Sequence, residues 1–208
     1  MRIKNILILN IFLSGFLTNS YCQKANIPQN EQQFINTCKK IGQALISKDL
    51  KTLNSYVNKN TGAYVLYGLG AYGGCLHLTK IVSDTSLFSL NEYYDSIPFK
   101  TDRLKFENKP IYFTCSGDDE NKSYQWNKEG SFIDISNKHK PISHLMHFWS
   151  QSDLGFELST SEKIRIKNIE KNMRKVVCTA ADTIFYMSFI NNKWYLTIID
   201  QLETDCDA

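Results

Sequence analysis

Residues 183–190 and 193–200 constrain the fold more than any other part of the chain. Both runs are rich in β-branched and aromatic residues, and only Asn191 and Asn192 separate them. Asparagine tolerates the positive φ that a two-residue hairpin turn requires. The spacing therefore predicts an antiparallel hairpin. One side of this hairpin is expected to bring together six apolar residues: Phe185, Met187, Phe189, Trp194, Leu196 and Ile198.

Other periodic runs predict the remaining elements. The clearest helix is 31–47, followed by a second short helix at 49–57 that Asp49 caps and a third at 142–150. Alternating or β-rich runs predict strands at 63–67, 75–82, 110–115, 124–126, 130–135, 163–167 and 175–179. The stretch 83–108 is expected to hold a loop and a short helix near 87–94.

This order of elements predicts the fold class. Helices that come first and an antiparallel sheet that comes last are typical of an α+β domain, with the N-terminal helices packed on a curved sheet. The length suits one domain at 31–208, preceded by a flexible leader at 23–30.

Residues 1–22 have the pattern of a signal peptide. A basic start with Arg2 and Lys4 is followed by an apolar run at 6–17, which is shorter than the roughly 20 residues of a membrane span. Ser20 and Cys22 are the small residues that signal peptidase needs, so we expect cleavage before Gln23. The mature chain is then exported, to a periplasmic or extracellular location, and has no membrane span.

Cys22 permits a second interpretation of the same segment. A bacterial lipoprotein signal also ends at a cysteine, which then carries the lipid anchor. Asn19 and Tyr21 fit that pattern poorly, and lipidation is therefore the lesser alternative, beside an uncleaved anchor.

The charge balance argues against some partners. Formal net charge is +3, and without Arg2 and Lys4 the basic count falls from 24 to 22 against 21 acidic residues. Nucleic-acid binding and attachment to an anionic membrane surface both favour a strong basic excess. We therefore expect neither partner.

The cysteines suggest disulfides. Six cysteines become five without Cys22, so an oxidising compartment leaves at least one thiol unpaired. Cys38 lies on the apolar stripe of the first helix and is expected to be that thiol. Cys75, Cys115, Cys178 and Cys206 then supply up to two bridges in one of three connectivities. The alternative is that all five are reduced and buried.

Two short strings resemble binding motifs. Gly68, Gly70 and Gly73 match G-x-G-x-x-G, but an alternating run follows them where a dinucleotide fold needs a helix, so we expect a glycine-rich turn and no cofactor. His144 and His147 form H-x-x-H, a weak metal candidate because zinc sites usually need a third protein ligand.

Acidic residues cluster twice. Asp118, Asp119, Glu120 and Asn121 lack the glycine and the late glutamate of an EF-hand, which favours a solvated turn over a calcium loop. The second cluster is predicted to be a solvated C-terminal tail. It comprises Asp200, Glu203, Asp205 and Asp207.

No sequence motif assigns catalytic residues. G-x-S-x-G, P-loop and C-x-x-C strings do not occur. Cys75 and His77 share a strand face and could form a thiol nucleophile pair, although a disulfide or a buried thiol is the preferred interpretation.

The C-terminal hairpin also carries a resemblance. Two leading helices and a meander that ends in the run Lys193-Trp-Tyr-Leu-Thr-Ile-Ile-Asp200 resemble the NTF2-like (cystatin-like) α+β group. Residues 185–208 also resemble uncharacterised secreted proteins of Bacteroidota. The resemblance implies a sheet that wraps a cone-shaped pocket, and homodimers through the sheet face. It implies no catalytic residues, because the group shares none.

Three functions follow as hypotheses. The first is an exported, non-catalytic domain that binds an unknown small molecule or protein. The second is a pocket enzyme, a hydrolase or isomerase, which requires a cavity that contains a His, Asp or Glu of perturbed pKa. The third is a structural envelope protein, which would show an exposed apolar patch and a sealed core.

Overall fold

The structure is a computed structural model, and it describes residues 29–69, 72–82, 104–116, 123–135, 139–151 and 158–206. Several predictions concern residues outside these ranges. They are the signal peptide at 1–22 with Cys22, most of the leader at 23–30, the short helix near 87–94 and the acidic turn at 118–121.

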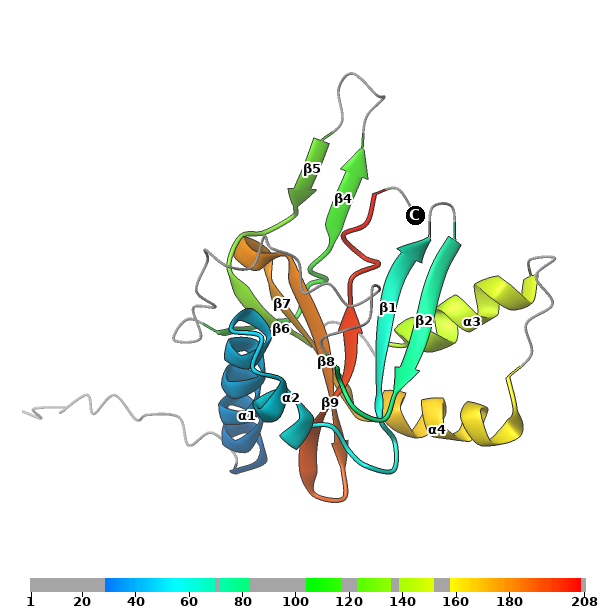
Figure 1. Ribbon diagram of the computed structural model, residues 1–208. Coiled ribbons are helices and arrows are strands. Elements are labelled where there is room, and N and C mark those ends of the chain that lie inside the picture. The colour runs from blue at the N-terminus through cyan, green and yellow to red at the C-terminus, as the bar shows by residue number, and fades with distance from the viewer. Residues whose placement is uncertain are drawn as a thin grey trace, which may run out of the picture.

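The chain folds around one seven-stranded, mostly antiparallel sheet with helices on both faces (Figure 1). The strand order is β2-β1-β9-β8-β7-β6-β3, and the β1–β9 and β3–β6 pairs are parallel. These strands are β1 (Ala63–Leu69), β2 (Tyr72–Leu78), β3 (Lys105–Glu107), β6 (Ser131–Asp134), β7 (Met173–Cys178), β8 (Thr183–Ile190) and β9 (Lys193–Asp200). The predicted α+β class is confirmed.

The β8–β9 hairpin lies at the centre of the sheet and is confirmed. Asn191 and Asn192 both have positive φ, as a two-residue turn of this kind requires. A β-bulge between Tyr186 and Met187 shifts the register. Because of this shift, Ile199 instead of the predicted Ile198 joins the cluster of Phe185 and Met187, and Ile198 faces the opposite side of the sheet.

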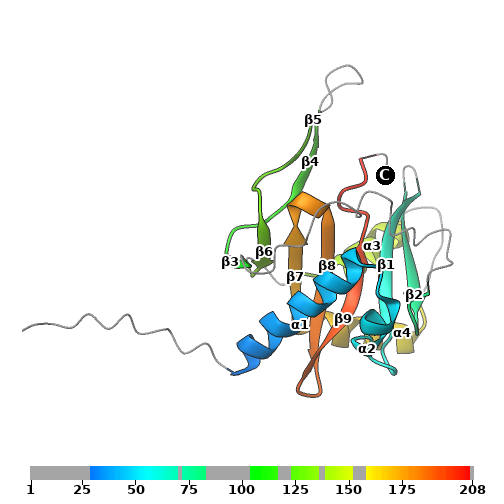
Figure 2. The same ribbon diagram turned by 60° about the vertical axis from the view of Figure 1, so that its left-hand side comes forward.

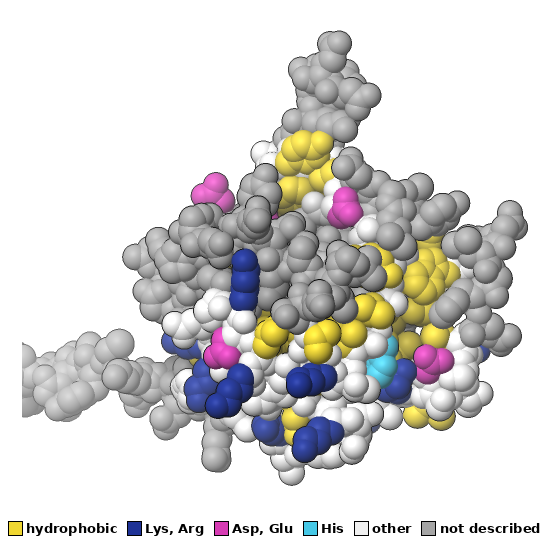
Figure 3. Space-filling view, viewed as in Figure 1, with side chains coloured by type: hydrophobic (Ala, Val, Ile, Leu, Met, Phe, Trp, Pro, Cys, Tyr) yellow, Lys and Arg dark blue, Asp and Glu magenta, His cyan; other side chains and the backbone are white. Residues whose placement is uncertain are grey.

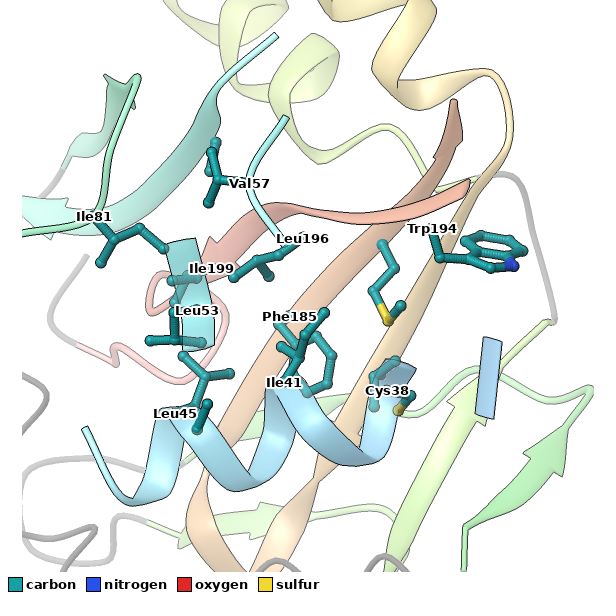
Figure 4. Packing of buried hydrophobic residues seen from close by; sticks show 14 of the residues in the cluster. Cys38, Ile41, Leu45, Leu53, Val57, Ile81, Phe185, Trp194, Leu196 and Ile199 are labelled. Atoms are coloured by element: carbon teal, nitrogen blue, oxygen red, sulfur yellow. The ribbon is translucent and has the colours of Figure 1, made fainter. Parts of the chain in front are cut away.

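The first face of the sheet is covered by the two leading helices, α1 (Gln29–Ile46) and α2 (Leu50–Ser55) (Figure 2). Phe34, Cys38, Ile41 and Leu45 of α1 are buried against the sheet, as the helical spacing predicts. Figure 4 shows this packing around Phe185. The Asp49 side chain accepts a hydrogen bond from the Thr52 amide, which confirms the predicted cap.

The second face is covered by α3 (Pro141–Gln151) and α4 (Thr160–Glu170). The predicted strand at 163–167 is wrong, because these residues are helical. Ser159 and Glu162 form a reciprocal capping box at the start of α4. Ile166 and Ile169 are buried at helical spacing, whereas Ile164 is 56% exposed. Tertiary packing therefore overrides the local alternation.

Two predicted strands have different bounds because side chains capture backbone groups. The strand expected at 75–82 ends at Leu78, since Asn54 hydrogen-bonds both the amide and the carbonyl of Ile81. The strand expected at 110–115 is β4 (Phe113–Ser116), since the Ile111 amide donates to the Asp134 carboxylate. These interactions satisfy backbone groups that a longer strand would have paired.

A separate two-stranded ribbon, β4 with β5 (Ser123–Trp126), projects from the sheet (Figure 1). Trp126 holds it by donating from Nε1 to the Asp182 carboxylate, at 2.7 Å. Tyr124 is exposed there, and apolar side chains are visible on the ribbon in Figure 3.

Within the described residues, no helix is long and apolar enough to cross a membrane.

Candidate functional site

A pocket of about 540 Å³ lies between α3 and α4. We call it the α3–α4 pocket. Four of its lining residues follow one another at helical spacing on α3, and the others belong to α4 or directly precede it. The lining comprises Ser143, Met146, His147, Ser150, Leu158, Lys163 and Ile166. Its volume falls in the range typical of small-molecule sites, roughly 300–1,000 Å³.

Glu170 ties the two helices together at this pocket. Its buried carboxylate accepts the Ser143 amide at 3.0 Å and also the Ser143 hydroxyl. Ser143 is the third residue of α3, where amides have no partner within the helix. The carboxylate of α4 therefore caps α3 and complements the positive end of its dipole.

The other side of α3 is anchored to the sheet. Ile142 and Leu145 are buried in the second core cluster. Trp149 Nε1 donates to the Gly73 carbonyl on strand β2, at 3.0 Å. These contacts fix the rotation of α3, so that Met146 and His147 face the pocket.

The hydrogen bonds of two α3 serines decide what these side chains offer to a ligand. The Ser143 hydroxyl donates to Glu170, and the Ser150 hydroxyl donates to the His147 carbonyl at 2.7 Å. Both hydroxyl hydrogens are thus committed, and the serine oxygens are left as acceptors. The His147 ring and the Lys163 ammonium supply further polar groups, beside the apolar Met146, Leu158 and Ile166.

The two histidines of the H-x-x-H string have different environments. Both side chains are exposed, but His147 lines the pocket, whereas His144 is not among the lining residues. The described part of the chain contains no group of three or more His, Cys, Asp or Glu residues placed to hold a metal ion. His77 and His139 lie elsewhere, beside the Thr61 carbonyl and Asp134 respectively.

Cys75 and His77 have the properties of a structural pair. The His77 Nε2 atom lies 2.8 Å from the Thr61 carbonyl oxygen. Burial, together with the nearby Asp200 and Glu170 carboxylates, raises the pKa of the Cys75 thiol to about 12. A thiol with this pKa supplies almost no thiolate near neutral pH, so Cys75 is a poor nucleophile.

Among the described cysteines, Cys115 and Cys206 form a disulfide. Two of the four predicted bridge residues are therefore paired, while Cys75 and Cys178 are free. Cys38 is free and buried, as the apolar stripe predicts, and burial raises its thiol pKa far above the usual value.

A buried polar cluster lies where the sequence predicts a solvated acidic tail. Asp200 and Lys175 are each 5% exposed, and the Lys175 ammonium contacts both Glu203 carboxylate oxygens, at 2.5 and 2.6 Å. Tyr186 donates from its hydroxyl to Asp200, at 3.3 Å. Burial and the Glu203 charge raise the pKa of Asp200 to about 6. The solvated-tail prediction is wrong for Asp200 and Glu203.

The sequence carries partial signals for Lys175 and Glu170, the two buried charges described above. Lys175 lies in a strand with Met173, Val176 and Val177, and such a charge is buried only when it is paired. Glu170 ends a helix whose capping box at Ser159 and Glu162 is readable from the sequence. Nothing in the sequence indicates which residues these two charges meet.

The glycine string lies in the β1–β2 hairpin. Gly68 pairs with Gly73 across two antiparallel strands, and residues 70–71 lie outside the described ranges. A side chain on Gly73 would meet Leu202 and Leu145, and one on Gly74 would meet the Tyr67 ring. These glycines therefore permit close packing at a hairpin, and the dinucleotide-type helix is absent from the described residues that follow.

No family model, curated protein or solved structure matches this chain.

Proposed function

We propose that this protein is an exported, non-catalytic binding domain whose ligand is a small amphipathic molecule held in the α3–α4 pocket. The observation that carries the proposal is the pocket itself, of about 540 Å³, between two helices that the Ser143–Glu170 contact holds together. A site of this kind is largely formed before the ligand arrives, which reduces the entropy cost of binding.

The lining specifies the chemistry of the ligand. Apolar atoms fit against Met146, Leu158 and Ile166. Because the hydroxyls of Ser143 and Ser150 are left as acceptors, the part of the ligand that faces these two serines needs donor groups such as hydroxyl or amide N–H.

A pocket enzyme is the second candidate, and the raised pKa of Asp200 favours it, because perturbed carboxyls cluster at active sites. However, Asp200 is not among the residues that line the α3–α4 pocket. One of its oxygens accepts the Leu202 and Glu203 amides and the other accepts the Tyr186 hydroxyl. These contacts support a structural role for Asp200, and with it the binding domain.

Kinship with the NTF2-like group is a further part of the proposal. Two leading helices on one face of the sheet support it. The parallel β1–β9 pair and the helices on the second face go beyond the layout that the resemblance implies.

Export and homodimer formation also remain predictions. Sequencing of the mature N-terminus tests export, and light scattering after size-exclusion chromatography tests homodimer formation.

Native mass spectrometry of the protein recovered from its exported fraction tests the binding function. We expect a retained extra mass that denaturation releases. Ser150→Leu fills the pocket from α3 and should abolish the extra mass, whereas Gln151→Leu, a leucine at the neighbouring exposed position outside the lining, should keep it.

A second measurement covers a ligand that dissociates during purification. The fluorescent probe 1-anilinonaphthalene-8-sulfonate should bind the wild type and Gln151→Leu and bind Ser150→Leu at least about tenfold more weakly. Bare protein together with equal probe binding by both variants would contradict the proposal. Conversion of the bound molecule into a product on incubation would favour the enzyme.

A further inference from the structure

The C-terminal segment, residues 201–206, is folded back against the sheet and α3. The Asp200 carboxylate accepts the amides of Leu202 and Glu203, at 3.0 and 3.1 Å, which turns the chain directly after β9. The Gln201 amide donates to the Leu66 carbonyl on β1. Leu202 packs beside Leu145 of α3 at Gly73 of β2. The segment thus closes one end of the second core cluster.

An ion pair holds the middle of this segment. Lys175 projects from β7, and its ammonium donates to both Glu203 carboxylate oxygens and, at 3.0 Å, to the Ile111 carbonyl. These three contacts use all three donors of the ammonium. Glu203 is the only charged partner among them, so its loss leaves a buried cation with one neutral acceptor.

A disulfide holds the end of the segment. Cys206 is bonded to Cys115 on the projecting β4–β5 ribbon, 91 residues away in sequence. Cys115 is exposed, whereas Cys206 is half-buried. A reductant in solution therefore reaches the bond from the Cys115 side.

We propose that the Cys115–Cys206 disulfide and the Lys175–Glu203 ion pair form a two-part latch, and that the C-terminal segment is released only when both parts are lost. Each part holds a different residue of the segment. While one part is closed, it keeps the other at high effective concentration, and the open state stays rare. In oxidising surroundings the segment is locked covalently, and under reducing conditions the ion pair is the part of the latch that remains closed.

The redox step consists of thiol–disulfide exchange with a dithiol reductant. A thiolate of the reductant attacks the Cys115 sulfur, the disulfide bond breaks, and the Cys206 sulfur leaves and takes up a proton. The second thiol of the reductant then attacks the mixed disulfide and releases Cys115 as a thiol. The protein gains two electrons and two protons, and the reductant becomes a cyclic disulfide.

Hydrogen exchange of the full-length protein tests the latch. The set comprises the wild type, Glu203→Gln, the Cys115→Ser/Cys206→Ser double variant and the triple variant, with Glu129→Gln as an exposed matched control. We expect the amides of residues 202–206 to exchange within about threefold of the wild-type rate in all but the triple variant. In the triple variant they should exchange at least about thirtyfold faster, because protection reports the open population.

Dithiothreitol should convert Glu203→Gln to the behaviour of the triple variant, and reoxidation should restore protection. Amides of β8 provide the folding control: loss of the disulfide lowers global stability and speeds their exchange, but they must remain slower than the amides of residues 202–206 in every variant. Protection that persists in the triple variant would overturn the latch, as would full release by either part alone. Exchange of residues 202–206 at the same absolute rate as β8 would also overturn it, because the opening would then be global unfolding.

Discussion

Replacement of Glu170 by glutamine tests how α3 is held beside the pocket. The substitution keeps the size of the side chain, and its carbonyl oxygen can still accept the Ser143 amide. It removes the negative charge from the helix N-terminus. It also places an amide N–H₂ where the Ser143 hydroxyl now donates, so that this hydroxyl must rotate and accept.

The magnitude follows from these two losses. A charge-assisted hydrogen bond contributes about 1 kcal/mol more than a neutral one. A partly buried charge at a helix terminus contributes about another 1 kcal/mol. Glu170→Gln should therefore lower the free energy of unfolding by about 2 kcal/mol. Glu170→Ala also leaves the Ser143 amide unpaired and opens a cavity, so it should cost about 3–4 kcal/mol.

Urea denaturation followed by circular dichroism measures this loss. With an m-value of about 2 kcal/mol per M, Glu170→Gln should lower the midpoint by about 1 M without a change in m. Glu129→Gln, on an exposed side chain, should leave the midpoint unchanged. An unchanged midpoint in Glu170→Gln would refute the reasoning, because the desolvation cost of the carboxylate would then cancel its interactions with α3.

Three further predictions concern stability. Because the pKa of Asp200 is raised from 3.8 to about 6, its stabilising contribution is complete below pH 3.8 and is lost as the pH rises through 6. Asp200→Asn lacks this titration, so between pH 4 and pH 7 the unfolding free energy of the wild type should fall relative to that of the variant, by on the order of 3 kcal/mol. A difference between the two proteins that does not change with pH would contradict the assignment. The Cys115→Ala/Cys206→Ala double variant should have a free energy of unfolding about 4–5 kcal/mol below that of the wild type in calorimetry, as expected for a bridge across 91 residues. An unchanged thermal transition would argue against the bond. Phe185→Ala should lower the free energy of unfolding, measured by chemical denaturation, by about 3–5 kcal/mol. Phe148 is half-exposed on α3, so Phe148→Ala should lower it by under about 1 kcal/mol. Equal losses in the two variants would contradict the observed burial.

Local patterns predicted the elements whose residues agree with their own neighbours. The β8–β9 hairpin follows from Asn191 and Asn192 between two β-rich runs, and α1 follows from apolar residues at helical spacing. Asp49 caps α2 as its position predicts. In these elements the signal lies within one turn or one helix of chain, so no distant contact was needed to read it.

Predictions failed where a distant partner decided the outcome. The alternation around Ile164 indicates a strand, but burial of Ile166 and Ile169 against the sheet selects a helix. Asn54 ends β2 from 27 residues away by capturing Ile81. Local propensity is a weak prior, and such long-range contacts override it.

The candidate site shows the same division. The H-x-x-H string indicates His147 only as a weak metal candidate, and the pocket that it lines depends on α4, where the sequence pattern predicts a strand. Glu170 and Lys175 are ordinary charged residues in the sequence, and only their buried partners give them a role.

The sequence by itself determined the α+β class, the central hairpin, the leading helices and the burial of Cys38, because each depends on periodicity and turn chemistry that neighbouring residues carry. The tertiary structure alone decided that helices cover both faces of the sheet, that Cys115 pairs with Cys206, and that Glu203 meets Lys175. These features join residues that are far apart in the chain. They arise only when the folded sheet brings those residues together and removes them from water, where an unpaired charge would be costly.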